Sequence, residues 1–198
     1  MTTLLEAVAN HCDTSYLAGL AQQVAQQFVR SMPAMAITDL TRHVMVAGPS
    51  TIPYLQRSAG DALIAAIKDR GEKPALIHAL RTLPQQFAFW KWYVDGRCGN
   101  VAQSMPGSSV FESGVAIEID DANEWVDVLR LHDWHWCGPQ DSAHFNYHGP
   151  QDPAFHCNSI WTFQLVWNRH HPDDTLQPLG VLSLDTLAKL EQSPAAGF

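Results

Sequence analysis

The chain has 198 residues, of which 46% are hydrophobic and 16% charged, and it contains seven Trp and eight Phe. This composition supplies apolar surface for one sizeable core and excludes a disordered chain. The formal net charge is −8 with no cluster of Lys and Arg, and the longest apolar runs are short, so neither nucleic acid nor a membrane is expected as a partner.

Apolar residues at spacings of three and four predict three helices in the first half of the chain. Gly71 is suited to end the second helix, because glycine readily adopts the left-handed conformation that follows a helix. Thr82 followed by Pro84 is typical of a helix start and predicts where the third helix begins. The expected helices cover residues 13–32, 55–70 and 82–95, and a short buried strand is expected at 75–79.

A strand is expected at 114–119, after a loop at 98–109 that contains Pro106 and Gly107. Side chains of a strand alternate between its two faces. One face therefore carries Val115, Ile117 and Ile119, and the other carries Gly114, Ala116 and Glu118. Two very small residues and one carboxylate on the second face predict the floor of a pocket.

The second half of the chain predicts further helices and a pair of aromatic-rich strands. Asp120 or Asp121 can cap a helix that carries Trp125 and Leu129. The two strands are joined by a short Gly138-Pro139 turn, which favours an antiparallel or mixed sheet. The strands are expected at 134–137 and 144–147, and two closing helices at 159–168 and 184–190. We therefore predict an α+β fold, a small antiparallel or mixed sheet flanked by helices, with a helical C-terminal cap.

The four cysteines, Cys12, Cys98, Cys137 and Cys157, lie far apart and form no Cys-x-x-Cys pair. This spacing is typical of neither a zinc knuckle nor a dense disulfide framework. The first nine residues carry no Lys or Arg, and no secretory signal is recognisable. We therefore expect reduced thiols and a cytoplasmic location.

The segment from Pro106 to Glu118, followed by Asp141-Ser-Ala-His144-Phe145, resembles the D-alanyl-D-alanine carboxypeptidase (VanY-like) family of zinc peptidases. The family pattern is Ser-x-His-x-x-Gly-x-Ala-x-Asp followed by Asp/Glu-x-x-His-Phe. The resemblance extends to Leu80-Arg81-Thr82, Gln85-Gln86, Trp125, Leu129 and Trp136. The C-terminal tail is similar to a degenerate peptidoglycan-binding repeat. The resemblance covers about three quarters of the chain, from about Ile52 onward, and implies a carboxypeptidase-like core at 49–149 and a helical tail at 150–198. The segment 1–48 before them is expected to be helical from its apolar spacing.

The resemblance implies a metal site, but the chain departs from the family at its ligand positions. Phe111 stands at the first ligand position and cannot coordinate a metal, and Glu118 stands where the family has Asp. Only His144, with Asp141 in the position of the general base, matches the family. Glu112, beside Phe111, is expected to point elsewhere. No metal cofactor is therefore expected, because ligand count sets affinity, and zinc held by Glu118 and His144 is the alternative.

Without a metal, the expected site becomes a pocket for an amino-acid-like small molecule or short peptide. Glu118 on an apolar strand face should have a raised pKa, which suits a general acid or base. The family has an Arg at the position of Arg81 that contacts substrate charge, and such an Arg could bind a carboxylate bidentately. The remaining expected site residues are the catalytic Asp141 and His144 and the substrate-binding His78, Phe111 and Phe145.

Three functions remain open on this sequence. The first is a metal-independent enzyme acting on an amino-acid-like molecule, for which a condensation or cyclisation of the Pictet-Spengler type would suit the pocket. The second is a zinc D,D-carboxypeptidase with rearranged ligands, and the third is a catalytically inactive binding module. In the inactive module, Glu118 is only ion-paired with Arg81, His144 is a core histidine and Phe111 fills the metal cavity. The aromatic content is compatible with a homodimer.

Overall fold

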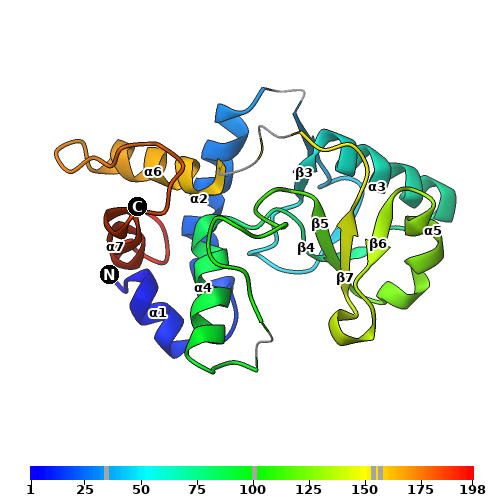
Figure 1. The fold of residues 1–198 in the computed structure, drawn as a ribbon, viewed down its shortest axis with the longest axis horizontal. Coiled ribbons are helices and arrows are strands. Elements are labelled where there is room, and N and C mark those ends of the chain that lie inside the picture. Colours follow the sequence, from blue (N-terminus) through cyan, green and yellow to red (C-terminus); the bar gives the residue numbers. More distant parts are fainter. Residues whose placement is uncertain (34–35, 100–101, 153–154, 156–157) are drawn as a thin grey trace.

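Helices form one side of the molecule and a small sheet with two further helices forms the other (Figure 1). The computed structural model describes residues 1–33, 36–99, 102–152, 155 and 158–198. The first side contains α1 (Leu4–Asn10), α2 (Ala18–Ser31), α4 (Leu83–Val94), α6 (Asn158–His170) and α7 (Leu184–Gln192). The sheet side contains α3 (Arg57–Arg70) and α5 (Val126–Arg130). None of the helices among the described residues has the length and apolar character needed to cross a membrane.

The main sheet has five strands in the order β2-β4-β5-β7-β6. These are β2 (Met45–Val46), β4 (Ala75–His78), β5 (Ala116–Ile119), β6 (Trp134–Trp136) and β7 (His144–Tyr147). The β2–β4 pair is parallel and the other pairs are antiparallel, so the prediction of an α+β fold with a small mixed sheet is confirmed. A separate antiparallel pair joins β1 (Ile37–Asp39) to β3 (Tyr54–Gln56).

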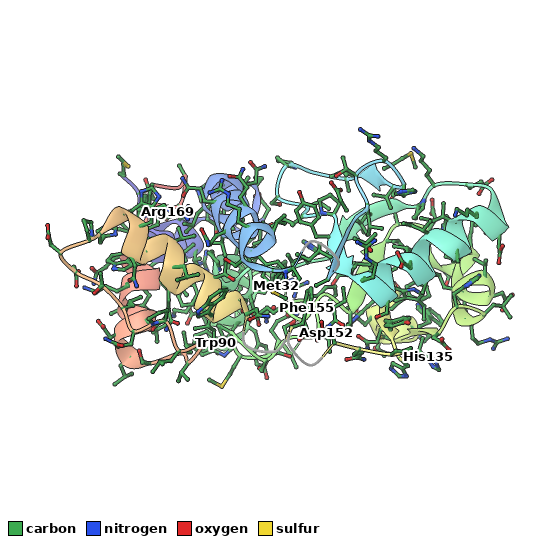
Figure 2. The ribbon with its side chains drawn as sticks, turned by 90° about the horizontal axis from the view of Figure 1, so that it is seen from above. Met32, Trp90, His135, Asp152, Phe155 and Arg169 are labelled. Carbon is green, nitrogen blue, oxygen red and sulfur yellow. A yellow bond between two sulfur atoms is a disulfide. The ribbon has the colours of Figure 1, made fainter. Side chains whose placement is uncertain are left out.

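Two hydrophobic cores correspond to the two sides. The sheet core packs one face of the main sheet against α3 and α5, and it includes Ile117, Ile119 and Phe145. The helical core draws residues from all three segments expected from the sequence, 1–48, 49–149 and 150–198. Phe155 of the tail illustrates this sharing, since its ring lies 5.2 Å from that of Phe28 in α2, and Figure 2 places it near the middle of the molecule.

The two ends of the chain lie side by side on the helical side (Figure 1). The Leu4 N–H donates to the Ser193 carbonyl (2.8 Å), and Thr3 forms a β-bridge with Pro194. The helix α1 was not predicted from the sequence, although Leu4, Ala7 and Val8 have helical spacing and Thr3 and Glu6 form a capping box at its start. The expected tail helices form and pack as a cap over the helical core.

Cys12 and Cys98 form a disulfide, although 86 positions separate them. Their Cα atoms lie 5.3 Å apart, within the range that a disulfide requires. The expectation of reduced thiols was therefore wrong for these two residues, because sequence spacing does not report which loops the fold brings together. Cys137 is a free, exposed thiol, and Cys157 lies outside the described residues.

Candidate functional site

A row of three polar side chains crosses the sheet on the face opposite to the sheet core. His78 of β4 pairs with Glu118 of β5, and Glu118 pairs in turn with His144 of β7. The register shifts between Leu76 and His78, so that Leu76 still pairs with Ile119 while His78 faces Glu118. A β-bulge of this kind re-aims a side chain, and here it adds His78 to the site.

The N-terminus of α4 positions the residues that surround Arg81. Gln85 Oε1 accepts hydrogen bonds from the N–H and the O–H of Thr82, both at 3.0 Å, and Pro84 lies in the first turn. This helix start was predicted from Thr82 and Pro84. It sets the rotation of α4 so that Gln86 and Phe89 face the guanidinium that precedes the helix.

The Arg81 guanidinium lies between two phenyl rings and is only 3% exposed. Its Cζ lies 4.2 Å from the ring centroid of Phe89 and 4.0 Å from that of Phe111. Nη1 donates to Gln86 Oε1 at 3.1 Å, and Nη2 lies 3.4 Å from Glu118 Oε1. The buried Nε–H has no hydrogen-bond partner in the described part of the chain, although buried donors are normally paired.

Burial and the Arg81 charge shift the pKa values of Glu118 and His78. Burial raises the pKa of Glu118, while the Arg81 charge opposes this shift. Burial lowers the pKa of His78 to about 3, and Arg81 adds to that effect, so the imidazole is neutral at neutral pH. His78 Nε2 lies 3.8 Å from Glu118 Oε2. The Glu118 side chain keeps 22% of its surface exposed.

His144 is bonded through both ring nitrogens. Nδ1 lies 2.7 Å from Asp141 Oδ2, and Nε2 lies 3.0 Å from Asn146 Oδ1. The ring of Phe111 lies 4.7 Å from the His144 ring, so Phe111 separates His144 from the Arg81 guanidinium on its other side. This placement agrees with the packing role considered for Phe111.

Phe145 does not lie with the other expected site residues. It is fully buried, and its partner on β5 is Ile117 in the sheet core. Neighbouring side chains of a strand point to opposite faces, so a strand that directs His144 toward the site directs Phe145 away from it. The expectation that Phe145 lines the pocket is therefore corrected, and Phe89 of α4 supplies an aromatic wall that the sequence did not reveal.

Zinc, which the family resemblance implies, does not fit the family's ligand positions in this chain. The ring of Phe111 occupies the first position, and Glu118 contacts Arg81. Those positions leave fewer than the three protein ligands that a catalytic zinc requires. The described residues contain one group of three metal-ligating side chains, which consists of Cys137, Asp141 and His144; sequence reasoning did not include Cys137.

Glu112 is a second buried carboxyl group, and the sequence did not predict its contacts. Its Oε2 accepts hydrogen bonds from the N–H groups of Gly107 (2.8 Å) and Ser109 (3.2 Å), and its Oε1 accepts one from the Ser159 hydroxyl (2.6 Å). Burial raises its pKa to about 7. Glu112 thus joins the loop before β5 to α6. The Ser-x-x-Glu spacing of Ser109 and Glu112, which is typical of backbone capping, was the available signal.

A cavity of about 370 Å³ opens beside the polar row. It is lined by Ile77, His78, Phe89 and Trp92 and by the segments 12–15 and 47–51, and its lining does not include Arg81 or Glu118. This volume falls within the range of small-molecule sites. No protein-family model and no curated protein matches the chain.

Proposed function

We propose that the protein is a metal-independent enzyme that transfers protons on an amino-acid-like small molecule, with Glu118 as the general acid and base. The observation that carries this proposal is the environment of Glu118, a partly exposed carboxyl group whose pKa is raised by burial beside an Arg with an unpaired Nε–H. Groups with such perturbed protonation are typical of catalytic sites. The resemblance to the VanY-like carboxypeptidases supports a site at this position of the sheet.

Arg81 anchors the substrate carboxylate in this proposal. The Nε–H and Nη2 groups form one edge of the guanidinium, which suits bidentate binding of a carboxylate. Among the described residues, Nη2 makes only a long contact with Glu118, and Nε makes no hydrogen bond. A substrate carboxylate that accepts from both groups would take the place of Glu118 at this edge.

Substrate binding would then prepare Glu118 to donate a proton. The Arg81 charge stabilises the ionised form of Glu118. A substrate carboxylate on Arg81 neutralises that charge, so the pKa of Glu118 rises further and the carboxyl group takes up a proton. Neutral His78 and the His144–Asp141 pair flank Glu118 on the neighbouring strands. This arrangement serves reactions that alternate proton donation and removal, such as condensation or cyclisation of an aromatic amino acid.

We also propose a class of binding partner and a cellular compartment. The expected partner is a small molecule or short peptide, and the cavity beside His78 offers space for one. The disulfide between Cys12 and Cys98 is typical of oxidising compartments and counts against the cytoplasmic location expected from cysteine spacing. A homodimer stays a prediction.

The test reaction is the Pictet-Spengler condensation of L-tryptophan with acetaldehyde, followed by mass spectrometry. In it, the amine and the aldehyde lose water to form an iminium ion, the indole carbon attacks, and a ring proton leaves. The whole chain, treated with EDTA and desalted, should form the tetrahydro-β-carboline acid. Tryptamine, which lacks the carboxylate, should show a raised KM. Glu118→Gln should lower kcat at least about 100-fold, the scale of general acid–base catalysis, and Arg81→Lys should raise KM.

The control variant is Glu124→Gln, which removes an exposed carboxylate paired with Arg70 away from the site and should leave the rate unchanged. Circular dichroism and thermal melting of each variant show whether it folds. Full activity of a folded Glu118→Gln would refute the acid–base role. Binding of L-tryptophan without turnover would support the inactive module. Hydrolysis of a D-Ala–D-Ala peptide that EDTA abolishes and zinc restores would support the zinc carboxypeptidase.

A further inference from the structure

A single β-hairpin brings together one thiol, one carboxylate and one imidazole. Cys137 directly follows β6, Asp141 ends the single turn of 3-10 helix at Pro139–Asp141, and His144 begins β7. Their sulfur, oxygen and nitrogen atoms all lie within 4.8 Å of one another. Because the three side chains belong to one short hairpin, gathering them around a common point requires little rearrangement of the fold.

The hairpin backbone is held by hydrogen bonds on both sides of the group. The Cys137 N–H donates to the His144 carbonyl at 2.9 Å, and the Asp141 N–H donates to the Gly138 carbonyl at 3.1 Å. The Trp136 Nε1–H donates to the Ser142 carbonyl at 2.8 Å. These bonds hold the connection between β6 and β7 in one conformation, so the three side chains are positioned before any ligand arrives.

Asn146 connects Cys137 to His144. Its Nδ2 donates to Cys137 Sγ at 3.2 Å, which turns its Oδ1 toward His144 Nε2 at 3.0 Å. With its hydrogen on Nε2, His144 would direct the lone pair of Nδ1 toward Asp141 Oδ2, which lies 2.7 Å away.

We propose that Cys137, Asp141 and His144 bind a thiophilic divalent cation, Zn²⁺ in the first instance. Thiolate, imidazole and carboxylate are the ligands that zinc takes in proteins, and three of them leave one position for water or another ligand. A thiolate and a carboxylate together neutralise the charge of the ion. The hydrogen bond from His144 Nε2 to Asn146 would act as the outer contact that fixes the orientation of a metal-bound imidazole.

This site differs from the metal position that the family resemblance implies, because it uses Cys137 and does not use Phe111 or Glu118. It shares Asp141 and His144 with the proposed proton-transfer site, but no metal takes part in that reaction and Glu118 is not a ligand of the metal site. Glu118→Gln therefore separates the two proposals, since it should abolish turnover and leave metal binding intact.

The test titrates the whole chain, freed of metal with EDTA and kept without reductant under nitrogen so that the disulfide stays closed. Co²⁺ should bind with one equivalent and give the near-ultraviolet charge-transfer band of a thiolate ligand, and Zn²⁺ should displace it. Zn²⁺ should also protect Cys137 from iodoacetamide, as read by peptide mass spectrometry. Cys137→Ser should remove the band, and Cys137→Ser, Asp141→Asn and His144→Gln should each weaken Zn²⁺ at least tenfold in competition with a chromophoric chelator.

Three control variants test whether the Co²⁺ band and the Zn²⁺ affinity come from Cys137, Asp141 and His144. Cys157→Ser should keep the band, which attributes it to Cys137. Glu118→Gln should keep full affinity. His135→Gln with His148→Gln should also keep it; these rings stack on each other at 4.2 Å, and Figure 2 shows His135 on the sheet side. A Co²⁺ complex without a thiolate band, unprotected Cys137, or Zn²⁺ affinity unchanged by Cys137→Ser would each overturn the proposal.

Discussion

Glu112→Gln should make the protein more stable at neutral and alkaline pH and remove part of its pH dependence. The glutamine has almost the same shape as the glutamate it replaces. Its oxygen can keep the two hydrogen bonds from Gly107 and Ser109, and its Nε2 can donate to the Ser159 hydroxyl, which can turn to accept. The substitution therefore removes the buried charge and retains the link between the loop and α6.

The magnitude follows from the pKa of Glu112, which burial raises from 4.5 to about 7. In the unfolded chain the group ionises above pH 4.5, whereas in the folded protein it keeps its proton until about pH 7. Its contribution to stability is therefore fully present below pH 4.5 and is lost as the pH rises through 7. The loss at pH 8 is about 3 kcal/mol, because a tenfold change in a proton-binding constant corresponds to about 1.4 kcal/mol.

Urea unfolding followed by tryptophan fluorescence at several pH values between 5 and 8 measures this effect. The free energy of unfolding of Glu112→Gln, minus that of the unmodified chain, should rise by about 2 to 3 kcal/mol across this range. Glu72→Gln is the matched control, since its carboxylate is 67% exposed and paired with Arg70; it should change stability by less than about 0.5 kcal/mol. A pH-independent difference for Glu112→Gln would refute the reasoning.

Three further predictions concern His78, the Arg81–Glu118 pair and the disulfide. His78 has a folded-state pKa of about 3 instead of 6.5, so the free energy of unfolding should fall by about 3 kcal/mol between pH 7 and pH 4 as the unfolded state gains a proton. In acid titrations monitored by circular dichroism, His78→Gln should remove this loss of stability, and an unchanged acid midpoint would contradict the prediction. Arg81→Met should lower the free energy of unfolding by about 3 kcal/mol because it leaves the largely buried Glu118 carboxylate unpaired, and adding Glu118→Gln should recover part of this loss. Strict additivity of the two substitutions in urea unfolding would show that Arg81 and Glu118 are not coupled. Cys12→Ser with Cys98→Ser should lower the free energy of unfolding by about 4 kcal/mol, since the disulfide closes a long loop across 86 positions. A non-reducing peptide map must first show the linked peptides, and two free thiols at these positions would reject the pairing.

The local elements of the fold were predictable because their signals are local. Helical spacing indicated α2, α3, α4, α6 and α7, and Gly71 ends α3 in the left-handed conformation (φ 78°) as expected. Alternation along 115–119 correctly separated the core face from the site face of β5. The same rule, applied to β7, would have excluded Phe145 from the pocket, because His144 and Phe145 are adjacent and must point to opposite faces.

The candidate site was predictable only in part. The sequence motifs selected His78, Arg81, Glu118, Asp141 and His144, and the structure brings the first three into contact around Glu118 and pairs the other two beside it. They did not indicate that Phe89 covers Arg81 or that Cys137 lies beside His144. Both contacts depend on how α4 and the β6–β7 hairpin are placed against β5, which no single segment encodes.

The sequence by itself determined α2, α3, α4, α6 and α7, the strands β4 to β7, the polar face of β5 and the acidic, core-forming character of the chain, because these depend on neighbouring residues and on composition. Only the tertiary structure decided the bulge that turns His78 toward Glu118, the enclosure of Arg81 between two rings, the burial of Glu112 and the pairing of Cys12 with Cys98. Each of these joins segments distant in the chain. Their positions follow from the packing of two whole cores, in which many weak contacts act together.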